Sequence, residues 1–163
     1  MSQSPYAPPT SHDAPSTNPD VDIADATAPM SAKAGGGVVL AAGLNFVLMA
    51  LQTLALVNMH GAWIVMPVLV LVVGLALMGA GVSLFRTRGW SALFALIASG
   101  VAVLLSLSWL VVTILSGIFG LFALTAPALS VAGVVAGAIN MAPVKRVSEA
   151  RARLAASGLH FGL

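Results

Sequence analysis

The feature that most constrains this chain is a long stretch almost without charge. Between Ala34 and Val144 the only charged residues are Arg86 and Arg88. A soluble globular domain carries about 25% charged residues, whereas only 7% of the 163 residues here are charged and 59% are hydrophobic, with a mean hydropathy of +1.01. Because apolar segments of about 20 residues are long enough to cross the hydrocarbon as helices, the sequence predicts an all-α integral membrane protein.

Residues typical of turns divide the apolar stretch into four predicted spans. We place these spans at about 36–57, 63–85, 91–114 and 118–141, which together form a transmembrane domain over residues 35–142. The predicted fold is therefore a four-helix bundle in the membrane.

The fourth predicted span contains a proline. Residues 128–141 alone would be too short to cross the membrane, so the helix should begin upstream and carry Pro127 internally. We expect a kink near Thr125–Pro127 and the end of the span before Pro143. A re-entrant segment followed by a short helix is the alternative interpretation.

The distribution of basic residues predicts the orientation. With four spans, both ends of the chain and the 86–89 loop lie on the same side, and this side contains all seven basic residues: Lys33, Arg86, Arg88, Lys145, Arg146, Arg151 and Arg153. Positive residues favour the cytoplasmic side. We expect a multi-pass protein of the plasma (inner) membrane with both termini in the cytoplasm.

The two ends of the chain have different compositions. Residues 1–34 are rich in Pro, Ser, Thr and Asp and are predicted to form a disordered tail. Residues 143–163 form a basic tail with a predicted amphipathic helix over about 144–157. Its apolar stripe of Val147, Ala150 and Leu154 would lie on the membrane surface, or would dock on a cytosolic partner.

Small and polar residues predict which helix faces meet, because lipid-embedded helices associate through close packing and hydrogen bonds. In the first span, Asn45 and Gln52 lie on a predicted inward seam with Ala41, Leu48 and Ala55. The third span has a seam of small residues that includes Ser99, Ser106 and Thr113, which could bond to the two amides or line a path with them. In the fourth, Gly133 and Gly137 form a GxxxG motif for packing within the bundle or for self-association.

The sequence lacks the residues that several classes of function require. The predicted spans contain no Asp, Glu, Lys, Arg or His for ion coupling or a proton relay. Without cysteine, a carboxylate pair or a metal-binding cluster, we expect no enzymatic activity, no cofactor and no metal. We expect no nucleic-acid binding either, since the basic residues flank apolar segments instead of forming one basic surface.

The leading functional hypothesis is a small non-enzymatic membrane protein that serves as an accessory or assembly subunit. It would act through helix–helix contacts with other subunits or copies of itself and through its cytoplasmic tails, with anionic lipids as further partners of its basic residues. A channel or carrier for a neutral or apolar solute and a holin-like permeabiliser are the alternatives. A composition low in Lys and rich in Ala, Gly, Val and Leu suggests a bacterial source.

Overall fold

The structure, a computed structural model, describes residues 23–56, 65–116, 121–156 and 158. Within these ranges the long elements are helices: α2 (Met30–Leu56), α3 (Val65–Phe85), α4 (Ser91–Ser116) and α5 (Leu121–Ala156). Each contains a segment long and apolar enough to cross a membrane. This finding confirms the prediction of four such helices. Of the predicted disordered tail, residues 1–34, the part before residue 23 lies outside the described residues, and residues 30–34 belong to α2.

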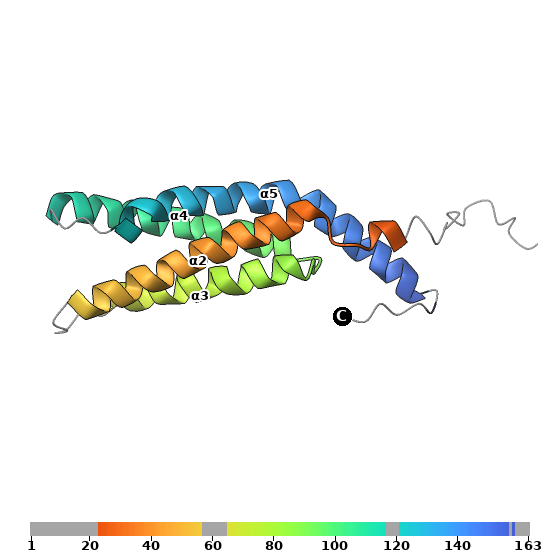
Figure 1. Ribbon diagram of the computed structural model, residues 1–163, viewed down its shortest axis with the longest axis horizontal. Helices are drawn as coiled ribbons and strands as arrows, with labels where there is room; N and C mark the ends of the chain where they lie inside the picture. Colours follow the sequence, from red (N-terminus) through yellow and green to blue (C-terminus); the bar gives the residue numbers. More distant parts are fainter. Residues whose placement is uncertain (1–22, 57–64, 117–120, 157, 159–163) are drawn as a thin grey trace, which may run out of the picture.

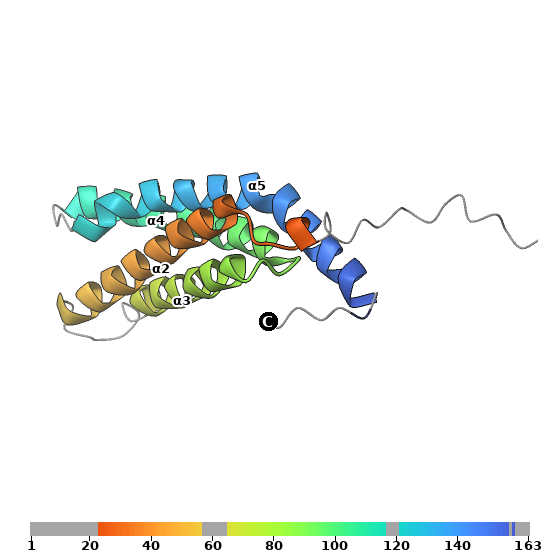
Figure 2. The same cartoon turned by 45° about the vertical axis from the view of Figure 1, so that its right-hand side comes forward.

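The four helices lie side by side, each antiparallel to the next (Figure 1). α2 packs on α3, α3 on α4, α4 on α5, and α5 returns to α2, so that the chain closes a four-membered ring. Figure 2 shows the same arrangement from a second direction, with α3 and α5 on opposite sides of α2. Large apolar side chains such as Leu104 and Val72 cover the outside of the ring, as expected for surfaces that face lipid.

α2 begins earlier than the sequence predicted. It starts at Met30, because the carbonyl oxygen of Pro29 accepts hydrogen bonds from the backbone N–H groups of Ala32 (3.0 Å) and Lys33 (3.3 Å). The sequence prediction began at residue 36, within the glycine triplet 35–37, because glycine has low helix propensity. Tertiary packing overrides that propensity, since Gly35 and Gly36 are buried against neighbouring helices.

α5 ends much later than predicted. It continues through Pro143 to Ala156, so the segment predicted as a separate surface helix belongs to the same 36-residue helix. Val144, Val147, Ala150 and Leu154 are buried, and this packing compensates for the backbone hydrogen bond that Pro143 cannot donate. α5 is also helical through Pro127, as expected, but Figures 1 and 2 show its clear change of direction near its C-terminal third.

Glycines bring the backbones of α2 and α3 into contact. A Cβ atom added to Gly43 would lie 2.8 Å from the carbonyl oxygen of Gly74, and one added to Gly81 would lie 2.9 Å from that of Gly36. Both distances are shorter than any ordinary contact, so these positions accept no side chain without a shift of one helix. The two contacts are seven residues apart along each helix, which fits two antiparallel helices crossing at a small angle.

Candidate functional site

The amide of Asn45 is the main polar group that links two candidate spans. Its Nδ2 donates a hydrogen bond to the carbonyl oxygen of Phe122 (3.0 Å), and its Oδ1 accepts one from the hydroxyl of Thr125 (3.0 Å). Asn45 is buried, and both of its partners belong to the first turns of α5. The contact therefore fixes the start of α5 against α2, just before Pro127.

This pairing differs from the prediction that Asn45 would bond to α4. The hydroxyls of Ser106 and Thr113 bond to backbone carbonyls of their own helix, those of Val103 (2.9 Å) and Trp109 (2.8 Å). Such bonds within a helix satisfy the hydroxyl group locally. Ser99 is fully buried, and its Oγ has no hydrogen-bond partner among the described residues.

Only part of the predicted inward seam of α2 is buried: Asn45 is buried as expected, but the other members are not. Ala41, Leu48 and Ala55 are exposed, and Gln52 is half-buried with no hydrogen bond to another described residue. The buried line is formed instead by Val39, Ala42, Phe46, Met49 and Ala50. The rotation of α2 follows from Gly36 and Gly43, whose contacts with α3 decide which face turns inward.

Gly133 and Gly137 lie between α4 and α5, within the bundle. A Cβ atom on Gly133 would meet the Ser99 Oγ at 2.5 Å, and one on Gly137 would meet the backbone nitrogen of Leu96 at 2.8 Å. The small residues of the predicted α4 seam, among them Ala95, Ser99 and Ala102, are buried at this interface. Both glycines therefore pack against α4 of the same chain.

Asn140 is a buried polar residue that is not among the predicted site residues. Its Nδ2 donates to the carbonyl oxygen of Ser31 in α2 (3.2 Å) and to that of Ala136 in its own helix (2.8 Å), and a Cβ on Gly35 would lie 2.7 Å from the same nitrogen. The sequence feature that could have identified Asn140 is its position seven residues after Gly133, which places both residues on the same face of the helix. Asn140 connects the N-terminal end of α2 to α5.

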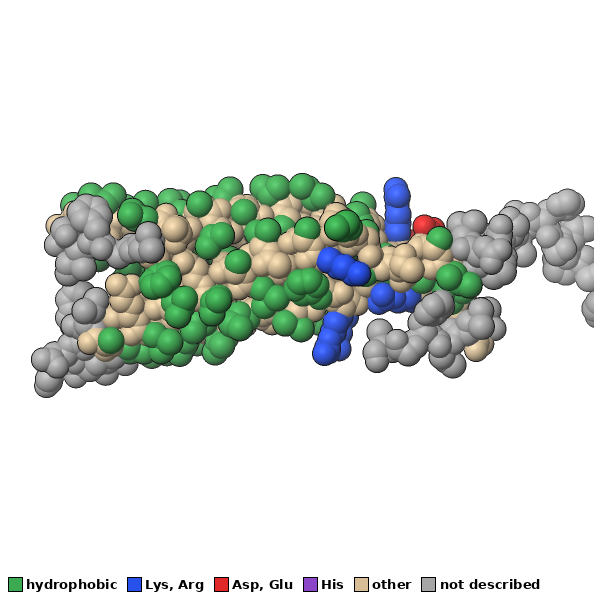
Figure 3. All heavy atoms as spheres, viewed as in Figure 1, with side chains coloured by type: hydrophobic (Ala, Val, Ile, Leu, Met, Phe, Trp, Pro, Cys, Tyr) green, Lys and Arg blue, Asp and Glu red, His purple; other side chains and the backbone are tan. Residues whose placement is uncertain are grey.

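The basic residues gather at one end of the molecule, where α5 extends beyond the other helices (Figure 3). Ala26 packs there against Ala150 and Leu154 of α5. The loop at residues 86–90 packs on the same part of α5, because a Cβ on Gly89 would lie 3.2 Å from the Ser148 Oγ. We call residues 23–29, the loop 86–90 and α5 residues 143–156 the basic platform.

Arg151 holds the basic platform together. Its Nε donates to the carbonyl oxygen of Ala26 and its Nη1 to that of Arg86, each at 3.1 Å. Arg151 is a predicted lipid-headgroup anchor, but its guanidinium donates hydrogen bonds to two backbone segments. Arginine suits this task because its planar group offers several donors in fixed directions.

The other predicted anchors are more accessible. Arg86, Arg88, Lys145, Arg146 and Arg153 are exposed. Lys145 forms an ion pair with Glu149, at 3.8 Å between Nζ and Oε1, and such an exposed pair contributes little stability. These five residues give the platform a positive surface.

The loop that carries Arg86 and Arg88 has a defined backbone conformation. The N–H of Thr87 bonds to the carbonyl of Leu84 (3.1 Å) and that of Arg88 to the carbonyl of Ser83 (3.5 Å), the pattern of a Schellman cap. Thr87 takes the left-handed position of this cap, with φ of 48°, where glycine is usual and a β-branched residue is strained. Burial of Thr87 helps to hold it there.

No cluster of three or more His, Cys, Asp or Glu residues able to hold a metal occurs among the described residues. Comparison of the chain with protein-family models, with curated proteins and with solved structures gave no match.

Proposed function

We propose that this chain is a non-enzymatic, multi-pass subunit of a bacterial inner membrane, with both termini in the cytoplasm. In this role it assembles with other membrane proteins through its lipid-facing helix surfaces and through the basic platform. The orientation rests on the positive-inside rule, since the basic side chains shown in Figure 3 gather at one end of the bundle.

The observation that carries this proposal is the packed structure of the platform. Basic residues can anchor a helix at a membrane surface without any tertiary structure, since their side chains reach the headgroups individually. Here Arg151 joins two other segments to α5, and Leu154 and Ala150 form a small apolar cluster with Ala26. A fixed surface of this kind suits a partner protein that recognises several positive side chains at once.

The packing between the helices supports an assembly role over transport. α2 contacts α3, and α5 contacts α4, by direct approach of glycine to the neighbouring backbone. The amide of Asn45 is bonded to the backbone and to a hydroxyl of α5. These contacts use the small and polar residues for structure, which is their common role in membrane helices.

Native mass spectrometry of the full chain, purified from its own membrane in mild detergent, tests this proposal. We expect the chain to carry a second membrane protein, or further copies of itself, at a fixed ratio. The double substitution Lys145→Gln/Arg146→Gln should weaken that association. Ala152→Gln/Ala155→Gln is the matched control, because it changes two exposed residues of the same helix without changing charge.

A monomer without any associated protein would contradict the proposed function. So would a complex that is weakened neither by Lys145→Gln/Arg146→Gln nor by removal of residues 143–163, since the platform would then contribute nothing to assembly.

A further inference from the structure

A pocket of about 330 Å³ lies beside the C-terminal end of α3, where the apolar bundle meets the basic platform. It is lined by Met78, Gly79, Val82, Ser83, Arg86, Arg88 and Trp90. Its volume falls at the low end of the usual range for small-molecule sites, about 300–1,000 Å³. One end of this pocket is apolar and the other end carries two positive charges.

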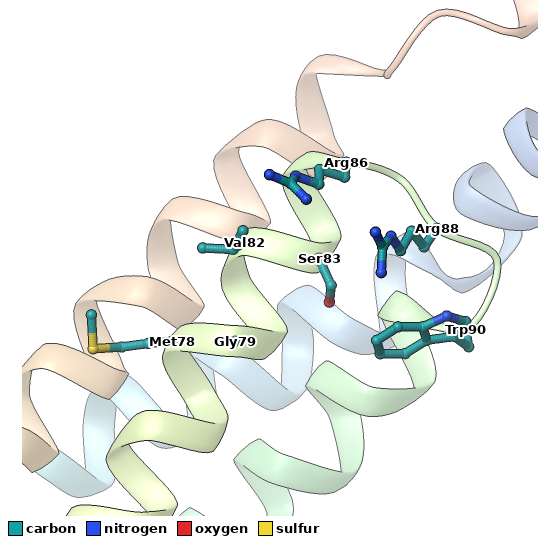
Figure 4. A pocket seen from close by; sticks show the side chains of 7 residues that line it. All are labelled: Met78, Gly79, Val82, Ser83, Arg86, Arg88 and Trp90. Carbon is teal, nitrogen blue, oxygen red and sulfur yellow. The ribbon is translucent and has the colours of Figure 1, made fainter. Parts of the chain in front are cut away.

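The charged end has no negative partner among the residues that the structure describes. Among the described residues, neither Arg86 nor Arg88 forms an ion pair. In Figure 4 the side chains of Arg86, Arg88 and Trp90 extend from the loop to the same side, and the Arg88 guanidinium lies between the Arg86 guanidinium and the Trp90 ring. Two guanidinium groups of this kind match the geometry of a phosphate, which accepts paired N–H bonds.

The apolar end is open because of a glycine. Gly79 is exposed, and a Cβ atom placed on it would meet nothing within 4 Å. Met78 and Val82 flank it on the outer face of α3 (Figure 4). An extended hydrocarbon chain can lie against this surface, whereas a soluble phosphate compound has nothing to place there.

The loop holds the two arginines in position before any ligand arrives. The cap hydrogen bonds at Thr87 and Arg88, the bond from Arg151 to the carbonyl of Arg86, and the contact of Gly89 with Ser148 all restrict it. Trp90 stacks edge to face with Phe94, with ring centroids 5.5 Å apart. Such preorganisation lowers the entropic cost of binding.

We propose that this pocket is a binding site for one anionic phospholipid. The phosphate lies between Arg86 and Arg88, the indole of Trp90 lies at the glycerol level, where tryptophan is favoured, and one acyl chain follows α3 across Gly79. This site is more specific than a general attraction of basic residues to the membrane surface, because it requires the pocket as well as the charge.

The test is titration of the purified full chain in detergent with phosphatidylglycerol or with phosphatidylcholine of the same acyl chains, with bound lipids counted by native mass spectrometry. We expect phosphatidylglycerol to bind first and more tightly. The Arg86→Gln/Arg88→Gln variant should lose about 30-fold in affinity for it, the combined effect of two interfacial basic residues. Lys145→Gln/Arg146→Gln removes the same charge elsewhere on the platform and should leave this affinity nearly unchanged.

A second pair of variants tests the apolar end. Gly79→Leu fills the pocket and should reduce the affinity several-fold. Gly100→Leu, at a glycine of α4 that also has open space around it, should not. Equal binding of the two lipids, equal losses in the two charge variants, or unchanged binding by Gly79→Leu would each overturn the proposal. None of these results depends on whether a partner protein copurifies.

Discussion

Single glycines decide how closely α2 and α3 approach each other. The substitution Gly43→Ala would place a Cβ atom 2.8 Å from both the Gly74 carbonyl oxygen and the Met78 backbone nitrogen. Because neither backbone atom can move alone, the helices must separate, and overpacking of this kind costs about 1–3 kcal/mol. We expect a lower free energy of unfolding, measured by circular dichroism during denaturation in mixed micelles.

Gly37→Ala is the matched control on the same helix. A Cβ atom at Gly37 would meet nothing within 4 Å, and alanine is favoured over glycine in helices by about 1 kcal/mol. This variant should be as stable as the original chain or slightly more stable. Equal destabilisation by both substitutions would show that the close contact at Gly43 is not the cause, because Gly37 has no such contact and helix propensity alone favours alanine at both positions.

At the scale of elements, the long α5 connects the bundle to the basic platform through Arg151. Arg151→Lys keeps the charge but cannot reach the carbonyls of Ala26 and Arg86 with the same pair of donors. We expect faster backbone hydrogen exchange at residues 23–29 and 86–90, with unchanged exchange in the centre of α3 and α4. Hydrogen exchange followed by mass spectrometry measures both.

Arg146→Lys is the control for this element, since Arg146 is exposed and also keeps its charge on substitution. It should leave exchange unchanged at all of these residues. If Arg151→Lys behaved in the same way, the two hydrogen bonds of Arg151 would not be what holds the platform together.

At the scale of the whole molecule, the basic platform and the segment 57–64 that connects α2 to α3 are expected from the positive-inside rule to lie on opposite sides of the membrane. The chain contains no cysteine, so single cysteines can be introduced and labelled without further changes. In intact cells, His60→Cys should react with a membrane-impermeant maleimide, whereas Glu149→Cys, on an exposed part of α5, should react only after lysis. The reverse pattern would overturn the proposed orientation.

Much of the architecture could be predicted from the sequence. Four long apolar segments separated by residues typical of turns are compatible with few arrangements other than four membrane-spanning helices. The starts of α3 and α4 lie within two residues of the predicted positions, and the small residues of the α4 seam are buried as expected. A fully apolar segment, however, has no polar face that reveals its rotation. α2 has few polar residues, and its predicted inward seam is correct at Asn45, which is buried, but wrong at Ala41, Leu48 and Ala55, which are exposed.

The sequence by itself determined the number of helices, their approximate ends in the middle of the chain, and the gathering of positive charge near one end. Only the tertiary structure decided that α2 reaches back to Met30, that α5 continues to Ala156, and that Asn45 bonds to α5. The physical reason is that apolar length and charge are properties of one segment. Helix ends, side-chain partners and the role of Arg151 depend on which other segments supply contacts and hydrogen-bonding groups.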